Sequence, residues 1–293
     1  CILFYRLGDF YEMFFEDAEI VSKELELTLT GKSCGLEERA PMCGVPFHAV
    51  ESYLTRLVSR GYKVAICEQV EDPKLAEGLV KREVVRIVTP GTNLDTYALD
   101  ESKNNYIMSI VYVDSKYGIS AADVTTGDYF VTEIDSERKL LDEISKYMPS
   151  EIICNEAFLV SGLDLDDLHH RLGIAVYPLD AWYFDDEMAK QTLLEHFHAA
   201  NPSGLGLEDY DCGITAAGSL LKYLQELQKT SLEHMTKLEP YSTSRYMIID
   251  SSTRRNLELV ETLREKQKRG SLLWVLDKTK TAMGARTLRS YIE

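Results

Sequence analysis

The sequence YIMSIVYVDSKYGISAADVTTGDYFVTEI, residues 106–134, consists of three apolar runs separated by two short polar segments. The runs span Tyr106–Val113, Tyr117–Val124 and Asp128–Ile134, and the segments between them read Asp-Ser-Lys and Thr-Thr-Gly. Val, Ile and Tyr favour strands, whereas Asp, Ser and Gly favour tight turns. This spacing therefore predicts an antiparallel meander of three strands.

After this meander the sequence alternates between helical and strand patterns. The expected elements are a helix at 136–147, a strand at 151–154, a short helix, a strand at 174–177 and helices up to residue 228. Three antiparallel strands followed by alternating helices and strands form the ribonuclease H-like arrangement. Before the meander, the polar and acidic stretch from Asn93 to Asn105 indicates a linker.

The remaining sequence predicts a mixed domain before the meander and helices after it. The expected N-terminal elements are strands at 2–6, 62–68 and 83–88 and helices at 11–25 and 48–60. From about Tyr241 the pattern becomes helical, with basic amphipathic stretches at 254–268 and 283–292. Because 293 residues exceed what one core usually organises, we expect three domains, at 1–96, 97–240 and 241–293.

The composition is that of a soluble globular protein. Hydrophobic residues make up 45% of the chain and aromatic residues 10%, and we find no run of ~18 apolar residues that could span a membrane. The six cysteines show no Cys-x-x-Cys spacing, which favours a reducing, cytoplasmic compartment. Because the chain starts at Cys1 without a signal segment and stops inside a helical pattern, we expect a fragment.

The charge is acidic but unevenly distributed. A net charge of −16 alone argues against a nucleic-acid partner, because phosphates are neutralised by Lys and Arg. The segment from Arg254 to Glu293, however, contains ten Lys and Arg and five Asp and Glu. Its net charge is +5, so the rest of the chain carries −21. Any surface that binds duplex DNA must therefore be local.

The most informative segment for function is FYRLGDFYEMF, residues 4–14. If it starts the first helix, Asp9 is the N-cap, Glu12 is its partner in a capping box and the aromatic residues are core. Phe10 fits this interpretation poorly, because Tyr11 and Phe14 already supply the apolar stripe. The alternative is an exposed phenylalanine two residues from a carboxylate, a pairing with chemical uses.

Five motifs resemble those of the MutS family of DNA mismatch-repair proteins, in the family's order and spacing. They are GDFYE (8–12), MCGVPFHAV (42–50) with ICEQ (66–69), RIVTPGT (86–92), ADVTTG (122–127), and TRRNLE (253–258) with GAR (284–286). The resemblance covers essentially the whole chain. It implies an α/β and α+β multidomain fold: a mixed α/β mismatch-recognition domain, a ribonuclease H-like connector, and the beginning of an all-α core or lever domain.

The resemblance also implies recognition of mispaired or unpaired bases in duplex DNA. Phe10 would insert at the mispair from the minor groove, where an apolar wedge unstacks a base step at a cost of roughly a few kcal/mol and kinks the duplex. Glu12 would hydrogen-bond the displaced base. An ionised carboxylate is unfavourable beside bases and phosphates, so a protonated, donating form of Glu12 in the complex is a hypothesis that the sequence leaves open.

Four further side chains are candidates for supporting contacts. Arg82, at the start of the last N-terminal strand, and Lys32 and Arg39, in a glycine-containing loop, could reach phosphates, and the alternative for each is solvated surface charge. Met42 begins a segment that resembles a family loop near the DNA, although core packing alone would also explain it.

The sequence has no Gly-x-x-x-x-Gly-Lys-Ser/Thr phosphate loop, so we expect no enzyme activity and no cofactor in this fragment. The resemblance implies ATP and Mg²⁺ for the full-length protein only. It also implies a homodimer for the full-length protein and a contact with MutL through the connector.

A different class of function would be a metal-dependent ribonuclease H-like nuclease or resolvase built on the second domain. Asp114 and Asp123, at strand ends, are its candidate metal ligands. Isolated acids at turns are usually solvated, and the family's connector is not a nuclease. A family member used in recombination is a further alternative, against which the presence of both Phe10 and Glu12 argues.

Overall fold

The computed structural model describes residues 1–33, 35, 38–71, 80–92, 102–243 and 249–292. The chain forms two compact units, one made of Cys1–Ala98 with Gln225–Thr230 and the other of Leu99–Leu224 with Ser231–Glu293. Each unit is built on a six-stranded sheet. The linker expected at 93–105 falls largely outside the described residues, at 93–101.

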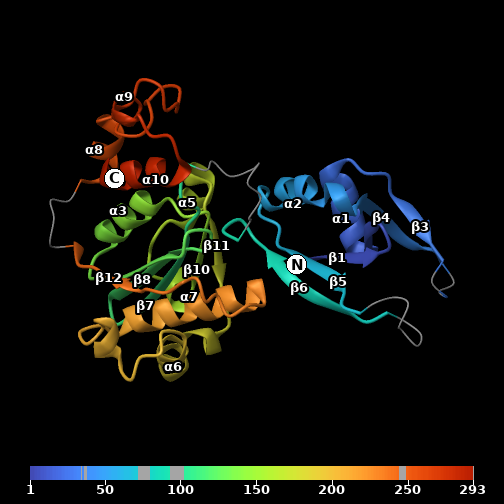
Figure 1. The fold of residues 1–293 in the computed structure, drawn as a ribbon, viewed down its shortest axis with the longest axis horizontal. Coiled ribbons are helices and arrows are strands. Elements are labelled where there is room, and N and C mark those ends of the chain that lie inside the picture. The colour runs from blue at the N-terminus through green and yellow to red at the C-terminus, as the bar shows by residue number, and fades with distance from the viewer. Residues whose placement is uncertain (34, 36–37, 72–79, 93–101, 244–248, 293) are drawn as a thin grey trace. The chain divides into compact units, whose positions relative to one another are not determined.

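The sheet of the first unit has the strand order β3-β4-β2-β1-β5-β6 (Figure 1). β1 and β5 are parallel, and the other neighbours are antiparallel. Two helices pack against the sheet. The elements are β1 (Ile2–Leu7), β2 (Phe10–Phe14), α1 (Phe15–Leu25), β3 (Thr30–Lys32), β4 (Ala40–Pro46), the 3-10 helix η1 (Phe47–Ala49), α2 (Val50–Val58), β5 (Val64–Gln69) and β6 (Arg82–Val88).

Side chains alternate between the two faces of this sheet, as they do along any strand. Phe4, Tyr11 and Met13 are buried in a core with residues of α1 and α2. The opposite face is called the outer face below. It carries Tyr5 on β1, Phe10, Glu12 and Phe14 on β2, Met42 and Gly44 on β4, and Lys32 on β3.

The structure corrects the predicted start of the first helix. Residues 10–14 form strand β2, and α1 begins only at Phe15, whose φ of 53° turns the chain between the two elements. The N-cap is therefore Phe14 and not Asp9, and Glu12 forms no capping box. β2 pairs with both β1 and β4, so it gains ladder hydrogen bonds on two sides, which outweigh one more helical turn.

Strands β3 and β4 were not predicted, since the segment around Met42 was interpreted as a loop. The other N-terminal elements are confirmed to within a few residues: the strands at 2–6, 62–68 and 83–88 correspond to β1, β5 and β6, and the helix at 48–60 to η1 and α2.

The second unit begins with the predicted meander, followed by parallel strands. β7, β8 and β9 are consecutive antiparallel neighbours, β10 is parallel to β7 and β11, and β12 is parallel to β9. The elements are β7 (Ile107–Val113), β8 (Lys116–Asp123), β9 (Asp128–Ile134), α3 (Glu137–Tyr147), β10 (Glu151–Cys154), α4 (Glu156–Leu159), α5 (Leu165–Leu172), β11 (Ala175–Pro178), η2 (Ala181–Phe184), α6 (Asp186–His196), η3 (Pro202–Leu205), α7 (Cys212–Gln228) and β12 (Glu239–Pro240).

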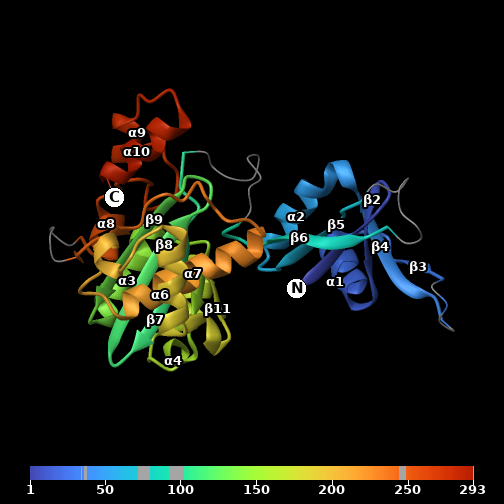
Figure 2. The ribbon, with the colours of Figure 1, turned by 60° about the horizontal axis from the view of Figure 1, so that its bottom comes forward.

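Helices cover both faces of this second sheet. Figure 1 shows α3 and α5 on one side of the strands and α6 and α7 on the other, and Figure 2 shows α6 and α7 in front of the sheet. Met108 and Ile110 belong to the core that includes α3 and α5, whereas Val111 packs with α7. A Cβ on Gly118 of β8 would lie 2.1 Å from the Cys212 carbonyl oxygen, so only glycine lets α7 start this close to the sheet.

The last part of the chain is less helical than predicted. The expected helix at 254–268 is wrong, because α8 (Ser251–Asn256) ends early and turns follow it. Glu258 has a φ of 47°, which the interior of a right-handed helix does not accommodate. A short α9 (Leu272–Leu276) follows, and α10 (Ala282–Ile292) confirms the helix predicted at 283–292. No helix in the described part of the chain combines the length and apolarity needed to cross a bilayer.

Candidate nucleic-acid interface

Phe10 lies at the start of β2, next to the tight turn that joins β1 to β2. Its Cα partners are Leu7 on β1 and Pro46 on β4. The ring is 47% exposed, so Phe10 is not part of the core, in agreement with the alternative drawn from the sequence. An exposed aromatic ring at the tip of a hairpin can be removed from water by stacking on another flat surface.

Glu12 lies two residues along the same strand, on the same face. Its carboxylate forms an ion pair with Lys32, with 2.5 Å between Oε2 and Nζ. The Lys32 ammonium also lies 5.5 Å from the centre of the Phe14 ring. Lys32 is thus on a strand and not in a loop, and its ammonium is paired with a carboxylate of the same sheet.

Arg82 reaches the same surface from β6. Its guanidinium lies 5.2 Å from the ring centre of Tyr5, the cross-strand partner of Glu12. Nε donates to the Arg6 carbonyl oxygen at 2.9 Å, and Nη1 donates to the Val80 carbonyl oxygen at 2.8 Å. These two bonds fix the position of the guanidinium, so its charge is held beside the outer face.

Met42 also lies on the outer face, as the partner of Phe14 on β4. It is half-buried, and its carbonyl oxygen accepts a hydrogen bond of 3.0 Å from the Thr30 hydroxyl. Arg39 precedes β4 and is exposed. The structure therefore brings Phe10, Glu12, Met42 and Lys32 together on one face, with Arg82 beside them.

The turn that carries Phe10 is held from two sides. Arg6 donates to the carbonyl oxygen of Gly8, which has a φ of 60°, and the Phe47 amide donates to the carbonyl oxygen of Asp9 at 2.9 Å. The Arg6 guanidinium lies 3.8 Å from the centre of the Phe47 ring. One arginine thus links the turn to the start of η1, which limits the positions that Phe10 can take.

Tyr11 anchors this region from the buried side. Its hydroxyl donates to the Glu68 carboxylate, which also lies 3.8 Å from Nη1 of Arg6. Burial, followed by the nearby Glu68 carboxylate, raises the pKa of Tyr11 from 10.0 to about 12. The phenol therefore stays protonated and remains a hydrogen-bond donor under ordinary conditions.

The two acids proposed as nuclease ligands do not form a site together. Asp114 precedes β8 and Asp123 ends it, so the eight-residue strand separates them by roughly 25 Å. Asp123 is fully buried and accepts hydrogen bonds from the amides of Asn105 and Thr125 and from the Asn104 side chain. It has the role of a structural carboxylate.

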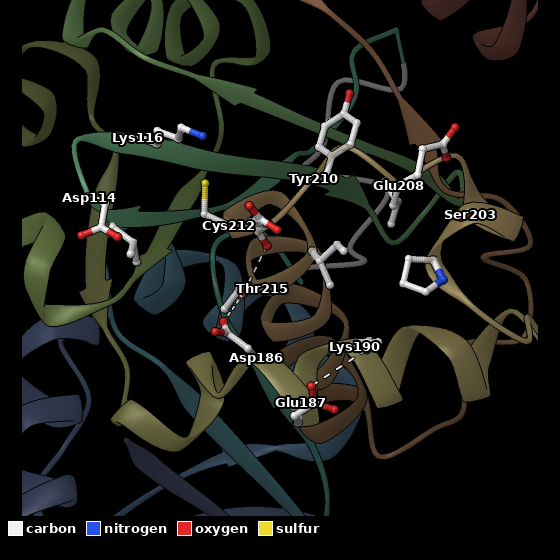
Figure 3. Close-up of a pocket in the computed structure, with 15 residues that line it drawn as sticks. Asp114, Lys116, Asp186, Glu187, Lys190, Ser203, Glu208, Tyr210, Cys212 and Thr215 are labelled. Carbon is white, nitrogen blue, oxygen red and sulfur yellow. Dashed lines mark hydrogen bonds and ion pairs between the residues drawn. The ribbon is translucent and has the colours of Figure 1, made fainter.

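Asp114 lines a pocket of about 510 Å³ between the β7–β8 turn and the starts of α6 and α7 (Figure 3). The acids of α6 in this pocket have neighbours there: Asp186 accepts from the Thr215 hydroxyl at 2.6 Å, and Glu187 lies 3.9 Å from Lys190. Across the described ranges, no three His, Cys, Asp or Glu side chains are arranged to hold a metal ion. The metal-dependent nuclease is therefore not supported.

Three successive segments of the chain each match a family model. Residues 1–97 match the model of MutS domain I, residues 105–236 that of MutS domain II, and residues 252–293 that of MutS domain III. The chain belongs to the MutS family. The outer face of the first unit thus lies in MutS domain I.

Similar proteins carry the same family name. The chain is 67% identical over its whole length to the DNA mismatch repair protein MutS of Lachnoclostridium phytofermentans, 55% identical to that of Ruminiclostridium cellulolyticum and 53% identical to that of Acetivibrio thermocellus. It covers 31%, 34% and 34% of these relatives. The chain thus spans about a third of the length of the curated relatives that it matches.

Two contacts of this surface have no clear signal in the sequence. The Lys32–Glu12 pair joins residues 20 positions apart, and no local pattern marks it. The contact between Arg6 and Phe47 depends on the register of β4, which was not predicted. The available signal was the apolar alternation from Met42 to Pro46, which is typical of a strand.

Proposed function

We propose that this chain recognises mispaired or unpaired bases in duplex DNA, as part of a MutS protein that acts in mismatch repair. Phe10 inserts at the mispair from the minor groove, and Glu12 hydrogen-bonds the displaced base. Insertion of an apolar side chain unstacks the duplex and kinks it, and this deformation costs less at a mispair than at a well-stacked pair. Arg82 and Met42 contribute supporting contacts to the DNA.

One observation carries this proposal: the Phe10 ring is 47% exposed at a hairpin tip, on the same face as the Glu12 carboxylate. A core phenylalanine could not leave its place to stack on a base. The ring is held at a defined position, because Arg6 and Phe47 restrain the turn beside it. Such restraint reduces the entropy lost on binding.

For the rest of the chain, we propose a ribonuclease H-like connector at 97–240 and the start of an all-α core at 241–293, after a recognition domain at 1–96. The meander followed by parallel strands β10 and β11 supports the connector assignment. In the full-length protein we expect a homodimer, an ATPase that uses ATP and Mg²⁺, and a MutL contact through the connector. The chain itself is expected to be a binding module and not an enzyme.

The test is DNA bending by the full-length protein, measured as energy transfer between dyes at the two ends of a duplex. We expect the wild type to bring the ends closer on a mismatched duplex and much less on a matched one. Phe10→Ala should bind without this bend, because the wedge is gone. Equal bending by Phe10→Ala and wild type would contradict the proposed function.

A further inference from the structure

Lys32 and Glu12 form an ion pair although their strands are not neighbours. β4 lies between β3 and β2 in the sheet, so the two side chains cross over it. On β4 the residue opposite Glu12 is Gly44. A Cβ at this position would lie 3.6 Å from Cγ of Glu12 and 3.3 Å from the Tyr11 carbonyl oxygen. Gly44 therefore places no side chain beside Glu12 on β4.

The ion pair with Lys32 matters for Glu12, because the Glu12 side chain is mostly buried and has few charged neighbours. Its side chain is 17% exposed, against 42% for Lys32. The groups that face it are Tyr5 from β1 and Lys32 from β3, with Arg82 beyond Tyr5, while Gly44 contributes no charge from β4. Lys32 is thus the charge in direct contact with the carboxylate among the described residues.

A carboxylate that approaches DNA must lose its repulsion from the phosphates. It can take up a proton, or it can arrive with a cation bound to it. The choice matters chemically, because an ionised carboxylate only accepts hydrogen bonds, whereas a protonated one can also donate. The ion pair occupies Oε2, so Oε1 is the oxygen on which a base N–H would bind.

We propose that Lys32 is a positioning residue for Glu12, which brings the carboxylate to the mispaired base as one half of a neutral ion pair. This inference rests on the proposed function. Glu12 then binds in its ionised form and accepts a hydrogen bond from a base N–H, such as the imino group of guanine or thymine. Lys32 acts through Glu12, and this role is an alternative both to a phosphate contact by Lys32 and to a proton on Glu12.

The experiment compares Lys32→Met and Lys32→Arg in the full-length protein, by competitive binding of matched and mismatched duplexes. The mismatch preference of Lys32→Met should be about fivefold lower than that of the wild type, because the carboxylate of Glu12 then approaches the DNA without its cation. Lys32→Arg keeps the cation, so its mismatch preference should stay close to that of the wild type.

Arg39→Met is the matched control, because it removes an exposed cation close to Lys32 in the sequence. It should weaken binding to both duplexes alike. In a Glu12→Gln background, Lys32→Met should cause no further loss of mismatch preference, because its effect passes through the carboxylate.

Equal weakening on both duplexes by Lys32→Met, also present in the Glu12→Gln background, would overturn the inference and make Lys32 a simple phosphate contact. The proposed function would survive that result. If Glu12→Gln and Phe10→Ala themselves left mismatch preference unchanged, the proposed function would fail, and the inference with it. Melting curves of each variant separate these outcomes from loss of the fold.

Discussion

The carboxylate of Glu12 faces both Lys32 and the proposed DNA surface, so its replacement separates affinity from selectivity. Glu12→Gln removes a negative charge near the phosphates and keeps hydrogen-bonding capacity. We expect binding to matched DNA to hold or strengthen, while the preference for a mispair shrinks. Competitive binding across several mispairs measures both quantities.

Glu16→Gln is the control for this prediction, because it changes an exposed carboxylate in the first turn of α1. It should leave the preference as it is. Unchanged discrimination by Glu12→Gln across all mispairs would remove Glu12 from the site.

The contribution of Tyr11 to stability should depend on pH. An unfolded tyrosine ionises near pH 10, whereas the pKa of Tyr11 is raised to about 12 in the folded protein. The contribution of Tyr11 to stability is therefore present below pH 10 and declines as the pH rises from 10 toward 12. Tyr11→Phe should cost about 1 kcal/mol near pH 8 through the lost hydrogen bond to Glu68.

Denaturant unfolding at pH 8 and pH 11 checks this prediction. The difference in free energy of unfolding between wild type and Tyr11→Phe should narrow at the higher pH, because only the wild type loses stability through this group. A difference that widens with pH would show that the direction assigned to this pKa is wrong.

At the scale of elements, the sequence predicted strands best where the apolar period was unambiguous. The meander β7–β9 was recognised because Val, Ile and Tyr runs are separated by short turns. Residues 11–14 also fit a helical pattern, because Tyr11, Phe14 and Ala18 lie on one helical stripe. Pairing of β2 on both sides decided the outcome, and such long-range pairing cannot be inferred from local spacing.

The candidate site also has one feature that the sequence indicates and one that it does not. The sequence indicates the exposure of Phe10 only as an alternative, because Tyr11 and Phe14 already supply the expected core stripe. The sequence does not indicate the Lys32–Glu12 pair, because the pair crosses a third strand, β4, which lies between β2 and β3.

Arg6 holds the turn of the β1–β2 hairpin, and its replacement tests whether this turn matters for recognition. Arg6→Met removes the bond to the Gly8 carbonyl oxygen and the contact with Phe47. We expect about 0.5–1.5 kcal/mol of lost stability and a mismatch preference about threefold lower, because the wedge is held less firmly. Melting curves and competitive binding measure the two effects.

Arg60→Met is a matched control, since Arg60 also bonds a backbone carbonyl oxygen and a carboxylate, both of Glu24. It should cost similar stability and leave mismatch preference unchanged. Parallel losses of preference in the two variants would mean that stability and not the turn governs recognition.

At the scale of the whole molecule, the acidic net charge of −16 confines DNA binding to local surfaces. The isolated segment from Ser102 to Pro240 should therefore bind duplex DNA far more weakly than the full-length protein. Binding measured at several salt concentrations tests this, because phosphate contacts weaken steeply with salt. Affinity of the segment equal to that of the full-length protein would contradict its assignment as a protein-contact module.

Phe10 is proposed to be a wedge and not a core residue. Phe10→Ala tests this proposal through two measurements, of stability and of mismatch preference. Phe15→Ala, which removes a comparably exposed ring, is the control. If Phe10 were core, Phe10→Ala would cost roughly 3–5 kcal/mol of stability.

We expect instead that Phe10→Ala in the full-length protein melts with a free energy of unfolding within about 0.5 kcal/mol of the wild type. In competition between mismatched and matched duplexes, its preference for the mispair should fall by at least about tenfold, while salt-sensitive binding to matched DNA survives. A strongly destabilised Phe10→Ala protein, or a stable one that still prefers the mispair, would contradict the proposed role of Phe10 as a wedge.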